Sequence, residues 1–558
     1  MRSESILAVF LLLPAVLYSQ INPEWIQRYN GEGNGSDEIY AMVADNSGNI
    51  YTAGRTTVTG NGFDFIVLKY SSSGVLIWSR TYNGTGNGFD FANAIAADNS
   101  GNIFITGEST GSGSNKDFVT IKYNSSGNEE WVRRYNGAGN SVDIPSSVSA
   151  DLNGNCYVTG STFGNGTSFD CVTIKYSSDG TQEWINIYNG PGNSNDAGNY
   201  ISADNYGNVY VTGESFGVSS NFDYVTIKYN SSGNEIWNRR YNTSLNARDI
   251  GRALVIDGSE NVIVTGESVG SGTNSDYATI KYDSSGTELW VNRYTGPASS
   301  SPDEARAITS DENGNIIVTG ISVGNLTSYD FATVKYSSAG TELWVQRYNG
   351  PSNSFDEASS VTTDNQGNVY VSGLSFNTGT MDDLVVIKYN PDGAQQWLHR
   401  YNGTGNGNDN SVSVIHYSPG SLYACGSSTG AGTNFDAILI KYSELTGTGN
   451  TSSASLPGNY KLHQNYPNPF NPSTKIKYEL NSEDGNSVSR NFVSLKVYDI
   501  TGNKIRTLVN EYKNAGNYES DFSASDIPAG IYFCKMTVSD AENGNIKFSE
   551  ARKLILLK

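Results

Sequence analysis

Histidine and cysteine, on which many catalytic and metal sites depend, are scarce in this chain. Its 558 residues include only three histidines and four cysteines, namely His399, His416, His463, Cys156, Cys171, Cys425 and Cys534. The cysteines form no CxxC pair and have no histidine at ligand spacing, which disfavours a zinc site and a disulfide scaffold and predicts free core thiols. The histidines occupy unrelated places in the sequence, so a serine triad lacks its base. We therefore expect no enzyme activity.

Positive charge and long apolar runs are also lacking. Lys and Arg number 36 against 56 Asp and Glu, a net charge of −20 that disfavours nucleic-acid binding. A bilayer span needs about 20 apolar residues, so no transmembrane segment is expected. The apolar run from Ile6 to Leu17 is too short, follows Arg2 and ends near Ser19. Residues 1–19 are therefore predicted to be a signal peptide, which makes the mature protein secreted or attached to the outer cell surface.

Glycine and tyrosine are abundant, at 61 and 36 residues, and favour an all-β fold rich in turns. The tryptophans recur at intervals of 53 residues, with one interval of 54, at Trp25, Trp78, Trp131, Trp184, Trp237, Trp290, Trp344 and Trp397. A β-rich repeat of this length is typical of propeller blades. Because every unit carries the residue, packing between blades is favoured over sugar stacking as the role of the tryptophans.

One unit, residues 90–136, shows how a blade is encoded. Four strand-like stretches, DFANAIAAD, NIFITGEST, DFVTIKY and EEWVRRYN, are separated by turn sequences. Gly101 and Gly127 stand where tight hairpin turns require a positive φ. Each unit is therefore predicted to be an antiparallel four-stranded meander.

The number of units predicts how the fold closes. Eight sets of three strands end at a KY pair, and eight further strands surround the tryptophans, the first of which precedes any set. Residues 24–30 are therefore expected to pair with the last set, residues 409–442, and to remove an exposed edge. The prediction is a monomeric eight-bladed β-propeller over residues 20–443, closed by its N-terminal strand. Seven blades plus an unpaired unit is the alternative.

The D-x-x-G-N turns, the (Y/I)-(V/I)-T-G strand ends and the TIKY strands resemble the bacterial seven-bladed β-propeller (SBBP) repeats, over residues 24–443. The resemblance implies the propeller fold. That family has no single assigned activity, so no function follows from it.

A second domain is expected after the period stops. Residues 444–456 are small and polar and predict a flexible linker. Residues 457–558 alternate in strands such as KIKYEL, VSLKVYDI and GIYFCKMTV, and predict a small antiparallel β-sandwich. The run NYPNPFNPST, the turn VYDITGNKI and the stretch IPAGIYF resemble the type A C-terminal sorting domain of the type IX secretion system, whose motif covers Tyr466, Pro467, Asn468, Pro469, Phe470, Asn471 and Pro472. The resemblance implies export by the type IX machinery, with removal of the domain on release or surface attachment.

Two periodic sets of aspartates are the candidate site. One set opens the first strand of each unit and the other opens the third strand: Asp37, Asp90, Asp143, Asp196, Asp249, Asp303, Asp356 and Asp409, then Asp64, Asp117, Asp170, Asp223, Asp276, Asp330, Asp383 and Asp436. Both sets follow loops at one end of the blades, so their carboxylates are expected to rim that face. Fastening of each loop through backbone N–H groups is the favoured role. Binding of a divalent cation such as calcium, or of carbohydrate with loop aromatics such as Phe63 and Phe89, is the alternative, and no other cofactor is expected.

Arginines follow six of the tryptophans by three residues, and we expect them to form ion pairs between blades: Arg28, Arg134, Arg240, Arg293, Arg347 and Arg400. Together these features predict a secreted or cell-surface, non-catalytic binding or scaffold module with an extracellular protein or carbohydrate partner. Two alternatives stay open. One is a polysaccharide lyase or hydrolase that uses acidic residues of the loop face, and the other is a purely structural extracellular component.

Overall fold

The computed structural model describes residues 21–60, 62–164, 166–417, 420–443, 461–463, 465–480, 491–499, 504–514, 516–540 and 546–557. Every regular element in these residues is a β-strand, which confirms the predicted all-β class. The chain divides into two compact units, Met1–Gly447 and Thr448–Lys558. None of the described residues belongs to a helix long and apolar enough to cross a membrane. The predicted signal peptide and linker lie outside the described residues.

The first unit consists of four-stranded antiparallel sheets, which we number in chain order. Sheets 1 to 4 contain the following strands: β2 Asp37–Ala44, β3 Ile50–Val58, β4 Gly62–Tyr70, β5 Leu76–Tyr82; β6 Asp90–Ala97, β7 Ile103–Thr110, β8 Lys116–Tyr123, β9 Glu129–Tyr135; β10 Asp143–Ala150, β11 Cys156–Phe163, β12 Phe169–Tyr176, β13 Gln182–Tyr188; β14 Asp196–Ala203, β15 Val209–Phe216, β16 Phe222–Tyr229, β17 Glu235–Tyr241.

Sheets 5 to 8 follow the same pattern, except that β1 is the fourth strand of sheet 8: β18 Asp249–Ile256, β19 Val262–Val269, β20 Ser275–Tyr282, β21 Glu288–Tyr294; β22 Asp303–Ser310, β23 Ile316–Val323, β24 Tyr329–Tyr336, β25 Glu342–Tyr348; β26 Asp356–Thr363, β27 Val369–Asn377, β28 Met381–Tyr389, β29 Gln395–Tyr401; β30 Asp409–Tyr417, β31 Ser421–Thr429, β32 Phe435–Ser443, β1 Trp25–Tyr29.

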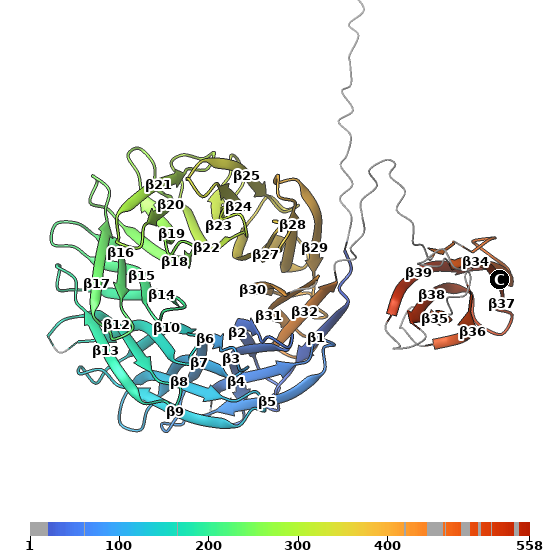
Figure 1. The fold of residues 1–558 in the computed structure, drawn as a ribbon, viewed down its shortest axis with the longest axis horizontal. Helices are drawn as coiled ribbons and strands as arrows, with labels where there is room; N and C mark the ends of the chain where they lie inside the picture. The colour runs from blue at the N-terminus through green and yellow to red at the C-terminus, as the bar shows by residue number, and fades with distance from the viewer. Residues whose placement is uncertain are drawn as a thin grey trace, which may run out of the picture. The chain divides into compact units, whose positions relative to one another are not determined.

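The sheets follow one another around a common centre, with their first strands innermost and their fourth strands outermost (Figure 1). The first strand of each sheet contacts the first strand of the next, and β30 contacts β2. The apolar core lies between neighbouring sheets. One of its clusters joins Ile39 and Ile66 of sheet 1 to Tyr423 and Leu439 of sheet 8.

Short turns join the strands of each sheet, as the glycine positions predicted. Gly101 has φ 76° and Gly127 has φ 80°, which confirms both expected turns. The Asp98 carboxylate accepts the backbone N–H groups of Ser100 and Asn102, at 2.8 and 2.9 Å. Its side chain therefore caps its own turn.

Neighbouring sheets are joined by one repeated contact. The indole N–H of Trp78 and the ammonium group of Lys69, both in sheet 1, donate to the Ser125 carbonyl of sheet 2, at 3.3 and 2.7 Å. Gly127 lies over the indole, where a Cβ would come within 2.8 Å of the ring. The same indole bond joins Trp131 to Ser178, Trp184 to Ser231, Trp237 to Ser284, Trp290 to Ser338, and Trp344 to Pro391.

Strand β1 takes part in the same contacts although it stands at the other end of the unit. It pairs with β32 so that Trp25 lies opposite Lys441, just as Trp78 lies opposite Lys69 in sheet 1. The Lys441 ammonium donates to the Ser72 carbonyl of sheet 1 at 3.1 Å, and Gly74 of sheet 1 lies over the Trp25 ring. β1 therefore has the register and the ring packing of a fourth strand, although the Trp25 indole N–H has no hydrogen-bond partner among the described residues.

The second unit consists of two antiparallel sheets with one shared core. Their strands are β33 Lys461–Leu462, β34 Ser473–Leu480, β37 Gly516–Ser523, and β36 Lys504–Lys513, β35 Asn491–Asp499, β38 Gly530–Asp540, β39 Ile546–Leu556. Leu462, Ile476 and Phe522 from the first sheet pack with Val497 and Leu554 from the second. Alternating buried and exposed residues in β34 give the sheet one face toward this core.

Candidate functional site

A β-bulge interrupts the first strand of every sheet in the first unit. The register slips between the second and fourth residues after the strand's opening aspartate, as between Ile39 and Ala41 in β2. The same slip occurs in β6, β10, β14, β18, β22, β26 and β30. The extra residue of a bulge leaves the regular alternation of side chains. The bulge residues are Tyr40, Asn93, Ser146, Asn199, Arg252, Arg306, Ser359 and Val412.

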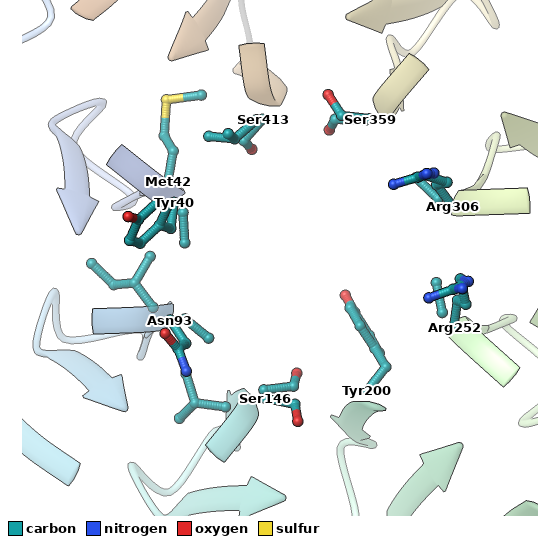
Figure 2. A pocket seen from close by; sticks show the side chains of 18 of the residues that line it. Tyr40, Met42, Asn93, Ser146, Tyr200, Arg252, Arg306, Ser359 and Ser413 are labelled. Atoms are coloured by element: carbon teal, nitrogen blue, oxygen red, sulfur yellow. The ribbon is translucent and has the colours of Figure 1, made fainter. Parts of the chain in front are cut away.

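A pocket of about 360 Å³ lies where these strands meet, and we call it the axial pocket. It is lined from all eight first strands, and seven of the eight bulge residues contribute to it. Figure 2 shows Arg252 and Arg306 side by side on neighbouring strands, with Tyr200 next to them and Asn93 and Tyr40 across the pocket. One side of the axial pocket therefore carries guanidinium groups, and the other carries amide and hydroxyl groups.

Three glutamates hold the two arginines. Arg252 pairs with Glu267 at 2.8 Å and Arg306 pairs with Glu357 at 2.9 Å, while Glu304 lies 3.9 and 3.5 Å from the two guanidinium groups. Burial raises the pKa of Glu357, although Arg306 opposes the shift. The Nε atoms of both arginines are buried and have no hydrogen-bond partner among the described residues. Each arginine therefore keeps an unused donor.

The remaining polar side chains of the axial pocket are neutral. Asn93 donates its amide to the Pro145 carbonyl at 2.8 Å, and the Ser359 hydroxyl donates to the Ser411 carbonyl at 2.6 Å. Of the described residues that line the pocket, none is a carboxylate, a histidine or a cysteine. The lining itself thus offers hydrogen bonds and charge, without a carboxylate or imidazole to act as a general base.

The opening aspartates of the first strands fasten the loops that precede them. The Asp37 carboxylate accepts the Gly31 N–H at 2.7 Å, and the Asp356 carboxylate accepts the Gly350 N–H at 2.7 Å. Equivalent bonds reach Asp90, Asp143, Asp196, Asp249, Asp303 and Asp409. Burial raises the pKa of Asp356 to about 6.

Neither set of aspartates rims the surface, and that expectation is wrong. All sixteen side chains are buried, with exposed fractions of 0 to 5%. The loops that the first set fastens fold over the carboxylates, because each carboxylate satisfies N–H groups of its own loop. Among the described residues, no group of three or more His, Cys, Asp or Glu side chains is arranged to hold a metal ion. The cation hypothesis remains a prediction.

The arginines form ion pairs within sheets, which corrects the expectation of pairs between blades. Arg134 of β9 pairs with Asp117 of β8 at 2.9 Å, and five other sheets repeat the pair at 2.6 to 3.0 Å: Arg28–Asp436, Arg240–Asp223, Arg293–Asp276, Arg347–Asp330 and Arg400–Asp383. The contact with the preceding sheet is instead a hydrogen bond, as from Arg400 to the Tyr348 hydroxyl at 2.6 Å. Because the fourth strand lies beside the third, the arginine reaches the aspartate of its own sheet over a shorter distance than an aspartate of the neighbouring sheet.

The other predicted residues lie apart from the axial pocket. The four cysteines are free and buried, as predicted. His399 is hydrogen-bonded to the Tyr442 hydroxyl at 2.9 Å, and His416 stacks on Tyr370. All eight tryptophans lie on outer strands. Phe63 and Phe89 of the loop face lie 5.8 Å apart, and Phe89 is 53% exposed.

Sequence reasoning missed the axial arginines. The sequence contains little signal for them: the third residue after each first-strand aspartate varies from unit to unit, but so do the two residues before it. Without the bulge, that position could not be assigned to the axis.

Comparison with known families agrees with this architecture. Residues 130–167 match the model described as "Beta-propeller repeat", and residues 464–548 match the "Secretion system C-terminal sorting domain". The chain carries a β-propeller repeat and a secretion-system C-terminal sorting domain. The type IX sorting domain indicates that the protein is secreted or attached to the outer cell surface.

Solved structures resemble the chain only distantly. A protein described as the extracellular domain of a hybrid two-component system from B. thetaiotaomicron is 11% identical, with a TM-score of 0.38, over 93% of this chain and 69% of its own. An α-L-arabinanase from Penicillium chrysogenum, complexed with arabinobiose, is 13% identical, with a TM-score of 0.36, over 62% and 91%. No curated protein matches the chain.

The sorting motif joins the start of the sorting domain to its last strand. The Phe470 N–H donates to the Ile555 carbonyl at 2.9 Å, and the Phe470 carbonyl accepts the Leu557 N–H at 2.8 Å. The Asn468 side chain bonds the backbone of Lys553 and Ile555. Phe470 is buried in the core, whereas Tyr466 is 83% exposed. The motif therefore has a structural part and a part open to solvent.

Proposed function

We propose that this protein is an extracellular, non-catalytic binding module whose ligand occupies the axial pocket. We further propose that the eight sheets are the blades of an eight-bladed propeller that β1 closes. The closure is supported by the contacts of Trp25, Arg28 and Lys441, each of which repeats the contact made by the equivalent residue of another sheet.

The variation at the bulge position carries the binding proposal. Residues that hold the sheets together recur in nearly every unit, whereas the bulge position presents Tyr, Asn, Ser, Arg or Val to the axis. Two adjacent arginines, each paired with a glutamate that does not itself line the pocket, give one side of the axial pocket its guanidinium groups. Binding sites are usually concave and combine a few placed polar groups with a rigid scaffold.

The charge balance of that side indicates the class of ligand. The guanidinium groups of Arg252 and Arg306 are already paired with glutamates that do not line the pocket, so a neutral ligand that both donates and accepts hydrogen bonds fits better than an ion. A hydroxyl-rich ligand such as an oligosaccharide has this property. Tyr40 and Tyr200 add aromatic surface for its apolar faces.

A glycan panel probed with the full secreted protein tests the proposal. We expect binding to one class of neutral glycan, and a loss of at least about tenfold in the double variant Arg252→Gln/Arg306→Gln, equivalent to about 1.4 kcal/mol. Arg133→Gln/Arg239→Gln, on the outer strands β9 and β17, is the matched control and should bind normally. Binding unaffected by the axial variant would refute the pocket. New reducing ends or unsaturated products would refute the non-catalytic assignment.

A further inference from the structure

Two of the eight sheets lack the arginine that pairs with the third-strand aspartate. The arginine is replaced by Thr81 in sheet 1 and by Ile187 in sheet 3. In the other six sheets the guanidinium group donates to the aspartate carboxylate and to the carbonyl and hydroxyl of a second-strand serine, and in most of them also to a tyrosine of the preceding sheet, as Arg400 shows. It donates to the Asp383 carboxylate at 3.0 Å, to the Ser375 carbonyl at 3.1 Å and to the Tyr348 hydroxyl of the preceding sheet at 2.6 Å.

Sheet 1 keeps the equivalents of all three acceptors. Asp64 stands in the place of Asp383, Thr56 in that of Ser375, and Tyr29 of β1 in that of the tyrosine from the preceding sheet. All three line one pocket of about 440 Å³, together with Thr81. The space that an arginine fills in six sheets is therefore a cavity in sheet 1.

Asp64 is buried in this cavity and has no partner among the described residues. Its exposed fraction is 4%, and no described residue donates a hydrogen bond to its carboxylate. In sheet 3 the Thr167 hydroxyl donates to Asp170 at 2.8 Å, as the residue three positions before the aspartate does in several other sheets; the equivalent residue of sheet 1, Asn61, lies outside the described residues. Burial and the nearby charge of Asp90 raise the pKa of Asp64 to about 6. A buried carboxyl group without a donor is costly, and a cation that reached it would remove that cost.

The cavity can be reached from outside the sheet. Its wall includes Glu32 and Gly33, from the loop that leads into β2, and Thr57, Val58 and Thr59, from the end of β3 and the turn beyond it. Both segments belong to the loop face. Thr81 itself is exposed.

We propose that this cavity of sheet 1, the Asp64 cavity, binds a guanidinium group in the position that arginine occupies in six other sheets. Asp64 provides the charge, while the Thr56 carbonyl and the Tyr29 hydroxyl provide the remaining acceptors. A planar guanidinium group suits this set better than a metal ion, because most of the filled sheets show its donors reaching the same carboxylate, carbonyl and tyrosine hydroxyl acceptors. The proposal does not depend on the axial pocket.

Titration calorimetry of the full protein with N-ethylguanidinium chloride tests the site. We expect saturable binding to the natural protein and its loss in Thr81→Arg, where the new side chain fills the cavity. The matched control is Ile187→Arg, which places an arginine at the equivalent position of sheet 3 and should leave probe binding unchanged. Thr81→Arg should also raise the melting temperature, so that its loss of binding is distinguished from unfolding.

Two further arms define the ligand. Ethylammonium chloride should bind at least several-fold more weakly, because it lacks the planar donors. If a blocked Gly-Arg-Gly peptide binds as tightly as the probe, the natural ligand is an arginine side chain. If the probe binds and the peptide does not, the natural ligand is a small guanidinium compound. Probe affinity should fall about tenfold from pH 7 to pH 5, as Asp64 is protonated.

Among the described residues of the cavity wall, none supplies a competing cation. The ionisable groups that face the Asp64 cavity from β1, the adjoining loop, β2 and β6 are Tyr29, Glu32, Asp37 and Asp90. Asp37 and Asp90 already accept N–H groups of their own loops. The proposal is overturned if the natural protein binds no probe, if Thr81→Arg binds it with unchanged affinity, or if ethylammonium binds equally well.

Discussion

The ion pair between Arg28 and Asp436 provides a sharp test of whether β1 completes sheet 8. The two residues are 408 positions apart, and their charged atoms lie 2.8 Å from each other. The Arg28 side chain is 24% exposed and that of Asp436 is 4% exposed, nearly the same as the 23% and 1% of Arg134 and Asp117 inside sheet 2. Arg28→Met and Arg134→Met should therefore have similar effects.

Removal of one member of a buried ion pair costs about 3–5 kcal/mol, because the remaining charge stays buried. Here each guanidinium group is partly solvated, so we expect a loss of about 2 kcal/mol for either variant. Urea unfolding monitored by tryptophan fluorescence measures the shift. Adding Asp436→Asn to Arg28→Met should recover part of the loss, because it removes the unpaired charge.

The result that would refute this reasoning is specific. If Arg28→Met left the urea midpoint unchanged while Arg134→Met lowered it, β1 would not be bound to β32 in solution. The closure of the propeller by its N-terminal strand would then be wrong, although the other seven sheets could still form.

Three further predictions concern other parts of the chain. Burial lowers the pKa of His399 to about 4, so between pH 6.5 and 4 the unfolded chain binds a proton there that the folded protein does not bind. Stability should therefore fall on acidification through this range. The variant His399→Gln, which copies Gln346 of sheet 6, should reduce this pH dependence of the melting temperature. Phe470→Ala should destabilise the sorting domain by about 3–5 kcal/mol, since Phe470 is 2% exposed, and calorimetry should show the propeller transition unchanged. Each first-strand aspartate already accepts donors from its own loop, so melting curves in calcium and in chelator should coincide; a calcium-dependent rise that the Asp90→Asn/Asp117→Asn variant abolished would instead establish a cation site.

Much of the architecture follows from local sequence. The all-β class, the four-stranded meanders and the turn glycines were predictable because strand alternation and turn chemistry act over a few residues, and Gly101 and Gly127 have the φ values that this chemistry requires. The tryptophan spacing located the outer strands, and the eightfold count led to the pairing of β1 with β32. The sorting domain was recognisable from its motif, which the family comparison confirms.

The candidate sites depended on the tertiary structure. A bulge breaks the alternation of side chains, so Arg252 and Arg306 reach the axis from a position that a regular strand would turn elsewhere. The aspartates are periodic in sequence, but whether each carboxylate lies open or buried depends on how the preceding loop folds over it. The sequence shows that Thr81 replaces the arginine beside Asp64, but the groups of β1, β3 and β5 that line the resulting cavity come together only when the sheets pack. Sequence periodicity specifies the repeated unit. A site formed between units depends on the distances between side chains of different units, and only the packing of the sheets determines those distances.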